Sequence, residues 1–568
     1  MDFEKQPHQC VLNTETLQFF SDFDSGNLLR AIKVGHNQYE LLISADASNK
    51  GLNHYRIWFY FGIRGMKKGS YRFTIINASN FKLFASPLYK PVWRAIPGSV
   101  EWQRVMQTTC YTMNFPNSYR FSWNFDCNFP DNEVYFALAP PYSYEHLVKS
   151  LDLYESLCPW DCAFYREVIT KSLDGRNVEI ITISSKKNFS GEREEREVGL
   201  FQSSIHRSFK SLKPIVFISA RVHPGETPSS YLLDTIIQLL ISKDPRGVTL
   251  RSNFVFKIIP MLNPDGVSRG HFRVDQNGIN LNRCYASPSM FDHPSIYAAK
   301  NYIEKIISSS LCFYLDLHAH GSKKSCFVYG NFIDMPRQAE NELFSKLLEI
   351  NSPYFDYMDC DFSEKSMTSK DPKDHHSKEG SGRVAFFRSL NLTFSYTIEA
   401  AFYIPKTLHP IPPMVNTKTG RRCSEVAVVE KFLVQVYNRL MFIDVGAAIL
   451  SSILDVFSIN PLSRLGATEY KNVEVLKEYI GNMVLTRKNP KLKKSLSRSE
   501  LPKASSDKIT ENFRRSGRLN IMMNQSDRNN DVARNTVCRF RSSYKYSCRP
   551  KTIDLKYKTQ KSIGEQRD

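Results

Sequence analysis

The feature that most constrains this chain is an alternation of apolar runs and helical segments between residues 178 and 400. The apolar runs are rich in β-branched and aromatic residues, and helical patterns separate several of them. Parallel strands need crossover connections, which are usually helices, so this alternation predicts an α/β domain around a mostly parallel mixed sheet flanked by helices. The expected strands are Val178 to Ser184, Pro214 to Ala220, Phe254 to Met261, Leu311 to Leu317 and Leu392 to Ala400, and the expected helices are Ser229 to Ile241, Ile296 to Ser308 and Ser424 to Phe457.

The segment that precedes the α/β region has a different sequence pattern. Short β-rich runs such as Arg56 to Ile63, Tyr71 to Ile76 and Val134 to Ala139 are separated by Asn, Gly and Pro. This pattern predicts an antiparallel β-sandwich. Pro140 and Pro141 then mark a boundary, so we expect a β-sandwich domain over residues 15–141 and the α/β domain over 142–465.

Most of the positive charge lies at the C-terminal end. From residue 485 to 568 there are 22 lysines and arginines against 8 acids, so this segment holds +14 of the chain's formal charge of +19. It contains few large apolar residues. We therefore expect residues 466–568 to form a basic, disordered tail.

Nothing in the sequence indicates export or membrane insertion. The first residues include Asp2 and Glu4 and no continuous apolar segment follows them, which is not typical of a secretory signal. The most apolar stretch, Leu440 to Ile459, is interrupted by Asp444 and Asp455 and is interpreted as a core helix. The 12 cysteines form no regular framework, which favours reduced thiols. We expect a cytoplasmic protein that is not secreted.

Polar residues that can bind a metal follow three of the expected strands. His223 and Glu226 come directly after one strand, His318 and His320 end a second, and Glu399 lies in a third, otherwise apolar one. Ligands of α/β sheets bind beyond the carboxyl ends of the strands, and two His with one Glu is a known catalytic zinc set. By period 2, His318 and His320 share a face, so spacing alone does not choose between them. A Glu in an apolar strand needs a partner, because burying an unpaired carboxylate is unfavourable.

Seven ordered motifs resemble those of the cytosolic carboxypeptidases, a branch of the zinc metallocarboxypeptidases. The resemblance extends over about residues 20–465 and includes Phe20-Ser-Asp-Phe-Asp-Ser-Gly-Asn-Leu28 at the start of the β-rich region. The motifs are His223-Pro-Gly-Glu226-Thr-Pro-Ser-Ser, Leu262-Asn-Pro-Asp-Gly266, Asn280-Leu-Asn-Arg283, Asp316-Leu-His318, Phe362-Ser-Glu-Lys365, Ser377-Lys-Glu-Gly-Ser-Gly-Arg383 and Ser395-Tyr-Thr-Ile-Glu399.

The resemblance implies a role for each matching residue in a hydrolase that uses one zinc ion per catalytic domain. His223, Glu226 and His318 match the zinc ligands, so the resemblance prefers His318 to His320. Glu399 matches the general base, and Arg273 matches the arginine that stabilises the developing oxyanion.

Three further residues match the substrate pocket. Asn282 and Arg283 match the pair that binds the terminal α-carboxylate, and Arg383 resembles the basic residue that faces a glutamate side chain. The sequences of the motifs around Phe362 and Arg383 most resemble those of the type-5 branch, whose members remove branch-point glutamates from tubulin. The implied substrates are therefore glutamylated tubulin or other acidic protein tails, and the implied locations include microtubules and cilia.

The chain departs from the type-5 pattern at two places, and two alternatives follow from the residues. The sequence differs from that of the type-5 branch at His318-Ala319-His320-Gly321 and at Ala400-Ala401-Phe402. These differences leave the choice between branch-point and linear glutamate open. One alternative is a non-catalytic scaffold whose basic tail binds microtubules or nucleic acid. The sequence contains no nucleic-acid-binding motif that supports this scaffold alternative. None of the residues that match the metal ligands or the general base is missing. The other is an enzyme that trims basic or apolar C-terminal residues.

Overall fold

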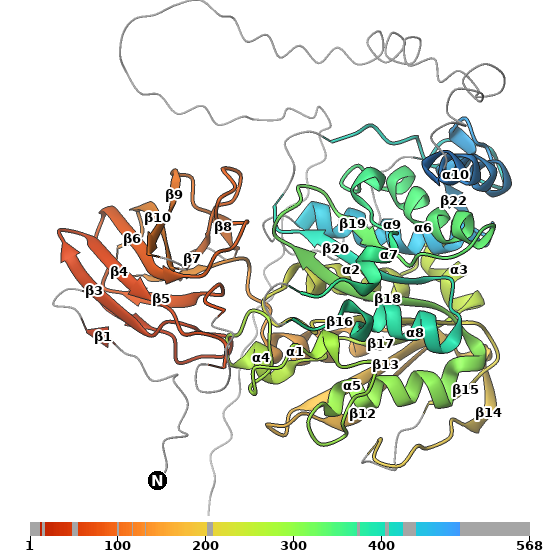
Figure 1. Cartoon of the computed structure of the whole chain (residues 1–568), viewed down its shortest axis with the longest axis horizontal. Coiled ribbons are helices and arrows are strands. Elements are labelled where there is room, and N and C mark those ends of the chain that lie inside the picture. The colour runs from red at the N-terminus through yellow and green to blue at the C-terminus, as the bar shows by residue number, and fades with distance from the viewer. Residues whose placement is uncertain are drawn as a thin grey trace, which may run out of the picture. The chain divides into compact units, whose positions relative to one another are not determined.

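The computed structural model describes residues 12–13, 17–47, 55–98, 101–115, 118–130, 132–201, 208–371, 375–403, 408–423 and 439–488. These residues contain a β-rich N-terminal domain and an α/β domain, coloured red to orange and yellow to blue in Figure 1.

Two sheets form the N-terminal domain. One has the order β1-β2-β5-β11-β7-β8 and the other β3-β4-β6-β10-β9. Every pairing is antiparallel except that of β4 with β6, which is parallel. The predicted antiparallel β-sandwich is therefore confirmed with one parallel pair added. The strands are β1 (Leu12–Asn13), β2 (Gln18–Phe20), β3 (Arg30–Gly35), β4 (Gln38–Leu42), β5 (Tyr60–Arg64), β6 (Gly69–Ala78), β7 (Val92–Ile96), β8 (Gln103–Arg104), β9 (Thr109–Phe115), β10 (Ser118–Cys127) and β11 (Glu133–Ala137).

A seven-stranded sheet is the centre of the α/β domain. Its order is β12-β13-β17-β16-β18-β20-β19. The four strands β17, β16, β18 and β20 are mutually parallel, and antiparallel strands complete both edges. The predicted mostly parallel mixed sheet is confirmed. Its strands are β12 (Cys162–Lys171), β13 (Asn177–Ser185), β16 (Ile215–Ala220), β17 (Val255–Ile259), β18 (Leu311–His320), β19 (Phe327–Tyr329) and β20 (Ser395–Ala401).

Helices cover both faces of this sheet (Figure 1). Because side chains alternate along a strand, Val216 and Ile218 enter one core, while Ile215 and Phe217 enter another. All six residues of β16 are buried, as expected for a central parallel strand. The helices are α1 (Tyr144–Leu157), α2 (Pro228–Ile241), α3 (Pro245–Asn253), α4 (Pro264–Ser268), α5 (Pro294–Asn301), α6 (Arg337–Asn351), α7 (Glu364–Thr368), α8 (Gly382–Leu390), α9 (Arg439–Val456) and α10 (Val473–Lys488). Two small two-stranded sheets pair β14 (Phe189–Arg193) with β15 (Phe209–Ser211) and β21 (Val415–Asn416) with β22 (Leu462–Ser463).

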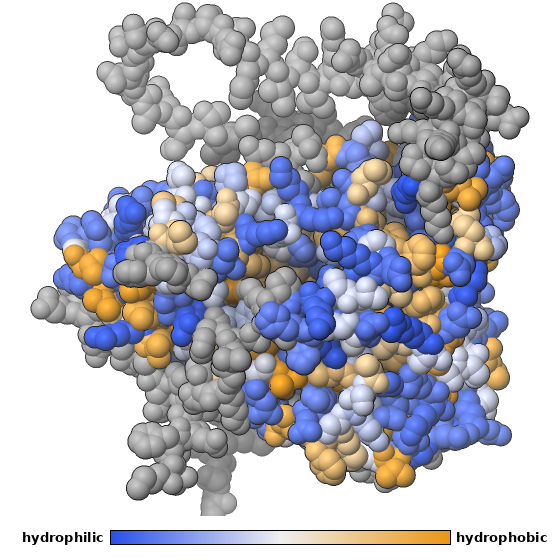
Figure 2. Space-filling view, in the orientation of Figure 1, coloured by the Kyte–Doolittle hydropathy of each residue, from blue (hydrophilic) through white to orange (hydrophobic). Residues whose placement is uncertain are grey.

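Helix α9 is the apolar stretch in which the sequence predicts a core helix. Most of its apolar side chains are buried in the core beside α2, and Asp455 accepts hydrogen bonds from Asn351, Asn460 and Ser463. Within the described residues, no helix has the length and apolarity to cross a membrane. The first part of the predicted helix, residues 424–438, lies outside the described residues. On the face drawn in Figure 2, apolar residues form small groups on a mostly hydrophilic described surface.

The folded chain continues past the predicted domain end at residue 465. Helix α10 packs Leu476 and Ile480 against Leu343 and Leu347 of α6. The predicted tail therefore starts too early. The amphipathic pattern of α10 was missed because only one narrow stripe of its apolar residues is buried. The remainder of the predicted tail, from residue 489, lies outside the described residues.

The N-terminal domain contacts the α/β domain at the segment that carries Arg273. Asp46 accepts hydrogen bonds from the backbone N–H groups of Phe272 and Arg273 at 2.8 and 2.7 Å. Asn27 donates to the carbonyl of Gly270 at 3.1 Å. The β-rich domain thus fixes the backbone of the segment that carries Arg273.

Candidate functional site

Three neighbouring parallel strands bring the polar candidates together. His223 and Glu226 lie in the turn between β16 and α2, His318 lies near the end of β18, and Glu399 lies in β20. In the strand register His318 is directly opposite Glu399. The carboxyl ends of these strands meet at one edge of the sheet, so residues far apart in the chain share one site.

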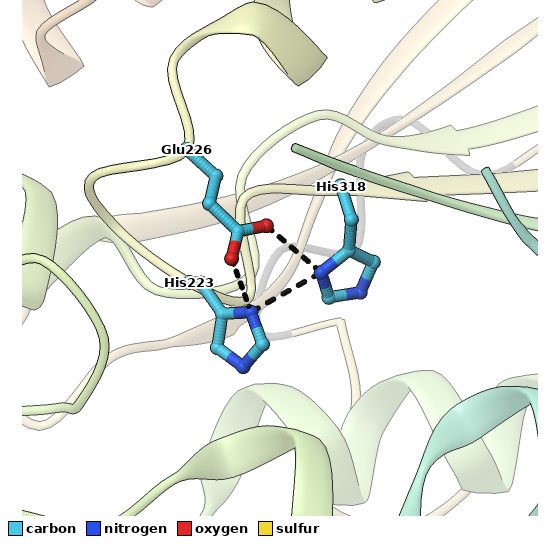
Figure 3. Close-up of side chains that lie close together, drawn as sticks. All are labelled: His223, Glu226 and His318. Atoms are coloured by element: carbon cyan, nitrogen blue, oxygen red, sulfur yellow. Dashed lines mark hydrogen bonds and ion pairs between the residues drawn. The ribbon is translucent and has the colours of Figure 1, made fainter. Parts of the chain in front are cut away.

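The side chains of His223, Glu226 and His318 point toward one another (Figure 3). Nδ1 of His223 lies 2.9 Å from Oε1 of Glu226, and Nδ1 of His318 lies 3.0 Å from Oε2 of Glu226 and 3.1 Å from Nδ1 of His223. Two ligand atoms about 2.0–2.1 Å from a tetrahedral zinc would lie roughly 3.3 Å apart. The observed spacing therefore fits one small cation shared by three ligands.

The other nitrogen of each ring bonds to an oxygen acceptor. Nε2 of His318 lies 2.8 Å from Oδ2 of Asp316, and Nε2 of His223 lies 3.1 Å from Oδ1 of Asn280. These bonds place the ring proton on Nε2, so the lone pair of each Nδ1 faces the centre of the cluster. Asp316 is itself held by the hydroxyl of Ser219 at 2.8 Å. The donor set and its supports fit zinc.

Burial and charge make the cluster suited to a cation. Burial opposes ionisation of Glu226, but the two histidines hold the pKa of this carboxyl well below its usual value. Burial lowers the pKa of His223 to about 4, which keeps that ring neutral and able to bind metal. Burial also disfavours the charged form of His318, yet Asp316 and Glu226 raise its pKa well above its usual value. Two carboxylates therefore create a negative potential that a cation would relieve.

A buried arginine holds the turn that carries His223 and Glu226. Arg221 has a left-handed backbone, with φ of 57°, and its guanidinium donates to the carbonyls of Pro224 and Tyr142 and to the hydroxyl of Ser230. The turn also packs closely on its neighbours: a Cβ at Gly225 would come within 2.9 Å of the backbone of Phe272. Only glycine fits there.

Glu399 and the cluster line one cavity of about 670 Å³. Burial, and then the charge of Glu226, raise the pKa of Glu399 to about 8, while His318 and Arg273 lower it. A carboxylate with its pKa moved toward neutrality is suited to accept and return protons. The structure thus brings the predicted base beside the predicted metal ligands.

The predicted substrate-binding residues line the same cavity. Nδ2 of Asn282 lies 3.4 Å from Nε2 of His318, which places the amide next to the cluster. The guanidinium groups of Arg273 and Arg283 both donate to Oδ2 of Asp371, at 3.0 and 3.2 Å. These residues form an anion-binding wall that already contains one carboxylate.

Arg383 lies in the cavity wall but is only 3% exposed. Its terminal nitrogens donate to the carbonyls of Gly330 and Ser366 and to the side chain of Asn331. Burial lowers the pKa of Arg383 to about 10. Most of this guanidinium therefore supports the wall, and less of it is open to a ligand than the sequence suggests.

Lys378 is a further cation of the cavity, beside Arg273, Arg283 and Arg383. Burial, and then the charges of Arg283 and Arg383, lower the pKa of its ammonium group. Crowded cations of this kind attract an anionic ligand.

His320 also lines the cavity but lies outside the three-residue cluster. Its Nδ1 accepts a hydrogen bond from the backbone N–H of Ser322.

Sequence reasoning did not assign roles to Arg221, Asn280, Asp316 and Asp371. Asp316 could have been found, because a position two residues before His318 in a strand shares its face. A buried arginine after a strand carries no such signal. Asp371 contacts Arg273 and Arg283 across about 90–100 residues of chain, which no local pattern encodes.

Family profiles match both domains. The cytosolic carboxypeptidase N-terminal domain matches residues 19–138, and zinc carboxypeptidase matches residues 161–407. The cytosolic carboxypeptidase-like protein 5 of Danio rerio is 31% identical over 83% of this chain and 68% of its own length, and that of Homo sapiens is 30% identical over 82% and 66%. The chain thus spans about two thirds of the length of these relatives.

Solved structures show the same fold. A metallo-carboxypeptidase from Burkholderia cenocepacia has a TM-score of 0.58 and 19% identity, covering 78% of this chain and 99% of its own. A metallo-carboxypeptidase from Pseudomonas aeruginosa, in complex with (2-guanidinoethylmercapto)succinic acid, has a TM-score of 0.53 and 18% identity, covering 78% and 99%. The two matched domains and the relatives of about 30% identity together establish that this chain belongs to the cytosolic carboxypeptidase family, within the zinc carboxypeptidases.

Proposed function

We propose that this protein is a zinc-dependent carboxypeptidase that removes glutamate from the ends of acidic protein tails. The observation that carries the proposal is one cavity that contains the His223, Glu226 and His318 cluster, the buried carboxyl of Glu399 and a wall of cations. A non-catalytic scaffold would not require a metal-binding cluster of side chains beside a carboxyl group whose pKa is near neutrality.

The residues can be given roles in peptide hydrolysis. Zinc held by His223, Glu226 and His318 would polarise the scissile carbonyl and acidify a water molecule. Glu399 takes a proton from the attacking water and returns it to the leaving amine. Arg273 donates to the oxygen on which negative charge develops.

A substrate with a free C-terminus fits the remaining polar groups. Asn282 and Arg283 bind the terminal α-carboxylate, since a guanidinium matches the planar carboxylate with two donors. The side-chain carboxylate of a glutamate then lies toward Lys378 and Arg383. An uncharged or basic side chain would leave the half-buried ammonium group of Lys378 without an anionic ligand, which favours glutamate over other residues.

We propose glutamylated tubulin as the substrate, with branch-point glutamate included; the motifs that resemble the type-5 branch and the cation-rich cavity support this proposal. The basic segment after residue 488 supplies a second contact with acidic tails, so we propose that it adds microtubule association in the cytoplasm or cilium. These contacts need neither a membrane nor a specific nucleic acid.

Peptides of matched length test the activity without tubulin. One would end in Glu, one in Gln and one in Leu, and mass spectrometry would follow each after incubation with the zinc-loaded protein. We expect removal of Glu at least tenfold faster than of Gln, a factor that corresponds to about 1.4 kcal/mol. Equal rates on all three peptides would reject the glutamate preference, and no cleavage of any would reject the activity.

A further inference from the structure

Asp371 lies between the two arginines of the anion-binding wall. One oxygen, Oδ2, accepts from Arg273 at 3.0 Å and from Arg283 at 3.2 Å. The side chains are largely shielded from solvent, with exposures of 19% for Arg273, 8% for Arg283 and 13% for Asp371. A carboxylate of the chain itself thus occupies a position that donors of the wall offer to a carboxylate ligand.

The backbone on each side of Asp371 holds it in this position. The N–H of Asp371 donates to the carbonyl of His376, and its own carbonyl accepts from His375. Lys370 and Ser377 form an antiparallel bridge. These bonds close the base of a loop whose described residues aim one carboxylate at the two arginines.

The segment that follows the loop is packed against the same wall. The N–H of Tyr285 donates to the carbonyl of Gly380 at 2.9 Å, and a Cβ at Gly380 would lie 2.0 Å from the carbonyl oxygen of Arg283. The loop is therefore attached directly to the backbone that carries Arg283.

We propose that Asp371 is a resident competitor for the carboxylate site, so that a substrate or product carboxylate binds by displacing it from Arg273 and Arg283. The inference rests on the proposed function for the identity of the ligand. Two shielded guanidinium groups without an anion would be unfavourable, and Asp371 offsets this in the free protein. An incoming carboxylate gains only the difference between its own bonds and those that Asp371 gives up.

This exchange has a functional consequence for an enzyme that releases glutamate. The product carries the same α-carboxylate as the substrate and would bind the same arginines. Asp371 returns to them as the product leaves, which weakens product inhibition and favours turnover. A site without Asp371 would bind both substrate and product more tightly.

Calorimetric titration of the zinc-loaded full-length protein with L-glutamate tests this directly. In Asp371→Asn we expect the dissociation constant of glutamate to fall by roughly tenfold, near the lower bound for a bond to a charged group. The KM for a Glu-ending peptide should fall in parallel, whereas Asp292→Asn, which removes an exposed charge outside the cavity, should change neither. Asp371→Glu, which keeps the charge, should restore weaker glutamate binding.

Weaker or unchanged glutamate binding in a folded Asp371→Asn protein would overturn the inference, since it would make Asp371 a positioning residue for the arginines. The thermal unfolding midpoint shows whether the variant is folded, and if it is not, Asp371→Glu and Asp371→Ser decide by the same titration. Because binding is measured without turnover, tighter binding by a protein that cleaves no peptide would reject the proposed function and leave this inference standing.

Discussion

Oδ2 of Asp316 lies 2.8 Å from Nε2 of His318, and this bond turns Nδ1 of the ring toward Glu226. The second oxygen of Asp316 accepts from Ser219, so both the carboxylate and the ring are fixed from within the sheet. His318 is therefore held by strand residues of the sheet, whereas His223 and Glu226 lie in the turn after β16, and these protein contacts orient the ring of His318.

Removing the charge of Asp316 should weaken zinc binding. Asp316→Asn replaces the charged acceptor that makes His318 more basic with a neutral amide oxygen, so we expect zinc affinity to drop by about 10–100-fold. Competition with a chromogenic chelator would measure it. Asp455→Asn, a substitution of another buried aspartate outside the cavity, controls for general destabilisation. Equal zinc affinities in the wild type and Asp316→Asn would show that the ring needs no such support.

The pH dependence of kcat/KM should report the ionisation of Glu399. Only the ionised carboxyl accepts a proton, so activity rises with pH through the pKa of Glu399. Burial raises that pKa above the usual 4.5, to about 8, and the positive charge of zinc lowers it from there. We expect an acid limb between pH 4.5 and 8 in the metal-loaded enzyme.

Zinc content measured at each pH separates this ionisation from metal loss. If kcat/KM falls only where zinc is released, the limb belongs to the ligands. A limb centred below pH 4.5 would contradict the raised pKa of Glu399.

Lys378 offers a cleaner test of side-chain recognition than Arg383. Arg383→Ala should also reduce activity on Glu-ending peptides more than on Leu-ending ones, but it removes bonds to Gly330, Asn331 and Ser366. Lys378→Met keeps the aliphatic stem and removes only the charge. We expect it to raise KM for Glu-ending peptides by roughly tenfold, the value of one charged hydrogen bond, and to leave Leu-ending peptides nearly unchanged.

Steady-state kinetics on both peptides would measure this, with Lys365→Met, an exposed lysine of α7, as the matched control. If the two peptides lose activity equally, Lys378 does not select the glutamate side chain.

A truncation after Lys488 tests the role of the basic segment. Cutting earlier would remove part of α10, whose Leu476 and Ile480 pack on α6, and would confuse lost binding with lost stability. We expect the truncated protein to cleave short peptides normally but to lose salt-sensitive binding in a microtubule sedimentation assay. Unchanged sedimentation would assign microtubule binding to the folded domains.

The sequence predicts much of the sheet and of the metal cluster, because both depend on local patterns. Apolar runs locate β16, β18 and β20, and strand ends locate His223, His318 and Glu399. Period 2 could not choose between His318 and His320, since both side chains lie on one face of β18. The structure separates them, with His318 in the cluster and His320 beside Ser322.

The parts that escaped prediction depend on distant contacts. Asp46 fixes the backbone of Arg273 across 227 residues, and Asp371 bridges two arginines from a different loop. Arg383 was expected to face the substrate, yet its terminal nitrogens bond to the protein. The sequence pattern placed residues 466–488 in the predicted disordered tail, although a narrow apolar stripe packs α10 against α6.

The most direct test of the central claim is incubation of the zinc-loaded protein and its Glu399→Gln variant with glutamylated tubulin, with glutamate chain lengths and branch points read by mass spectrometry. We expect glutamate loss with the wild type alone, at equal zinc content in both proteins. Tubulin that both proteins bind and neither changes would contradict it, and would identify the chain as a scaffold.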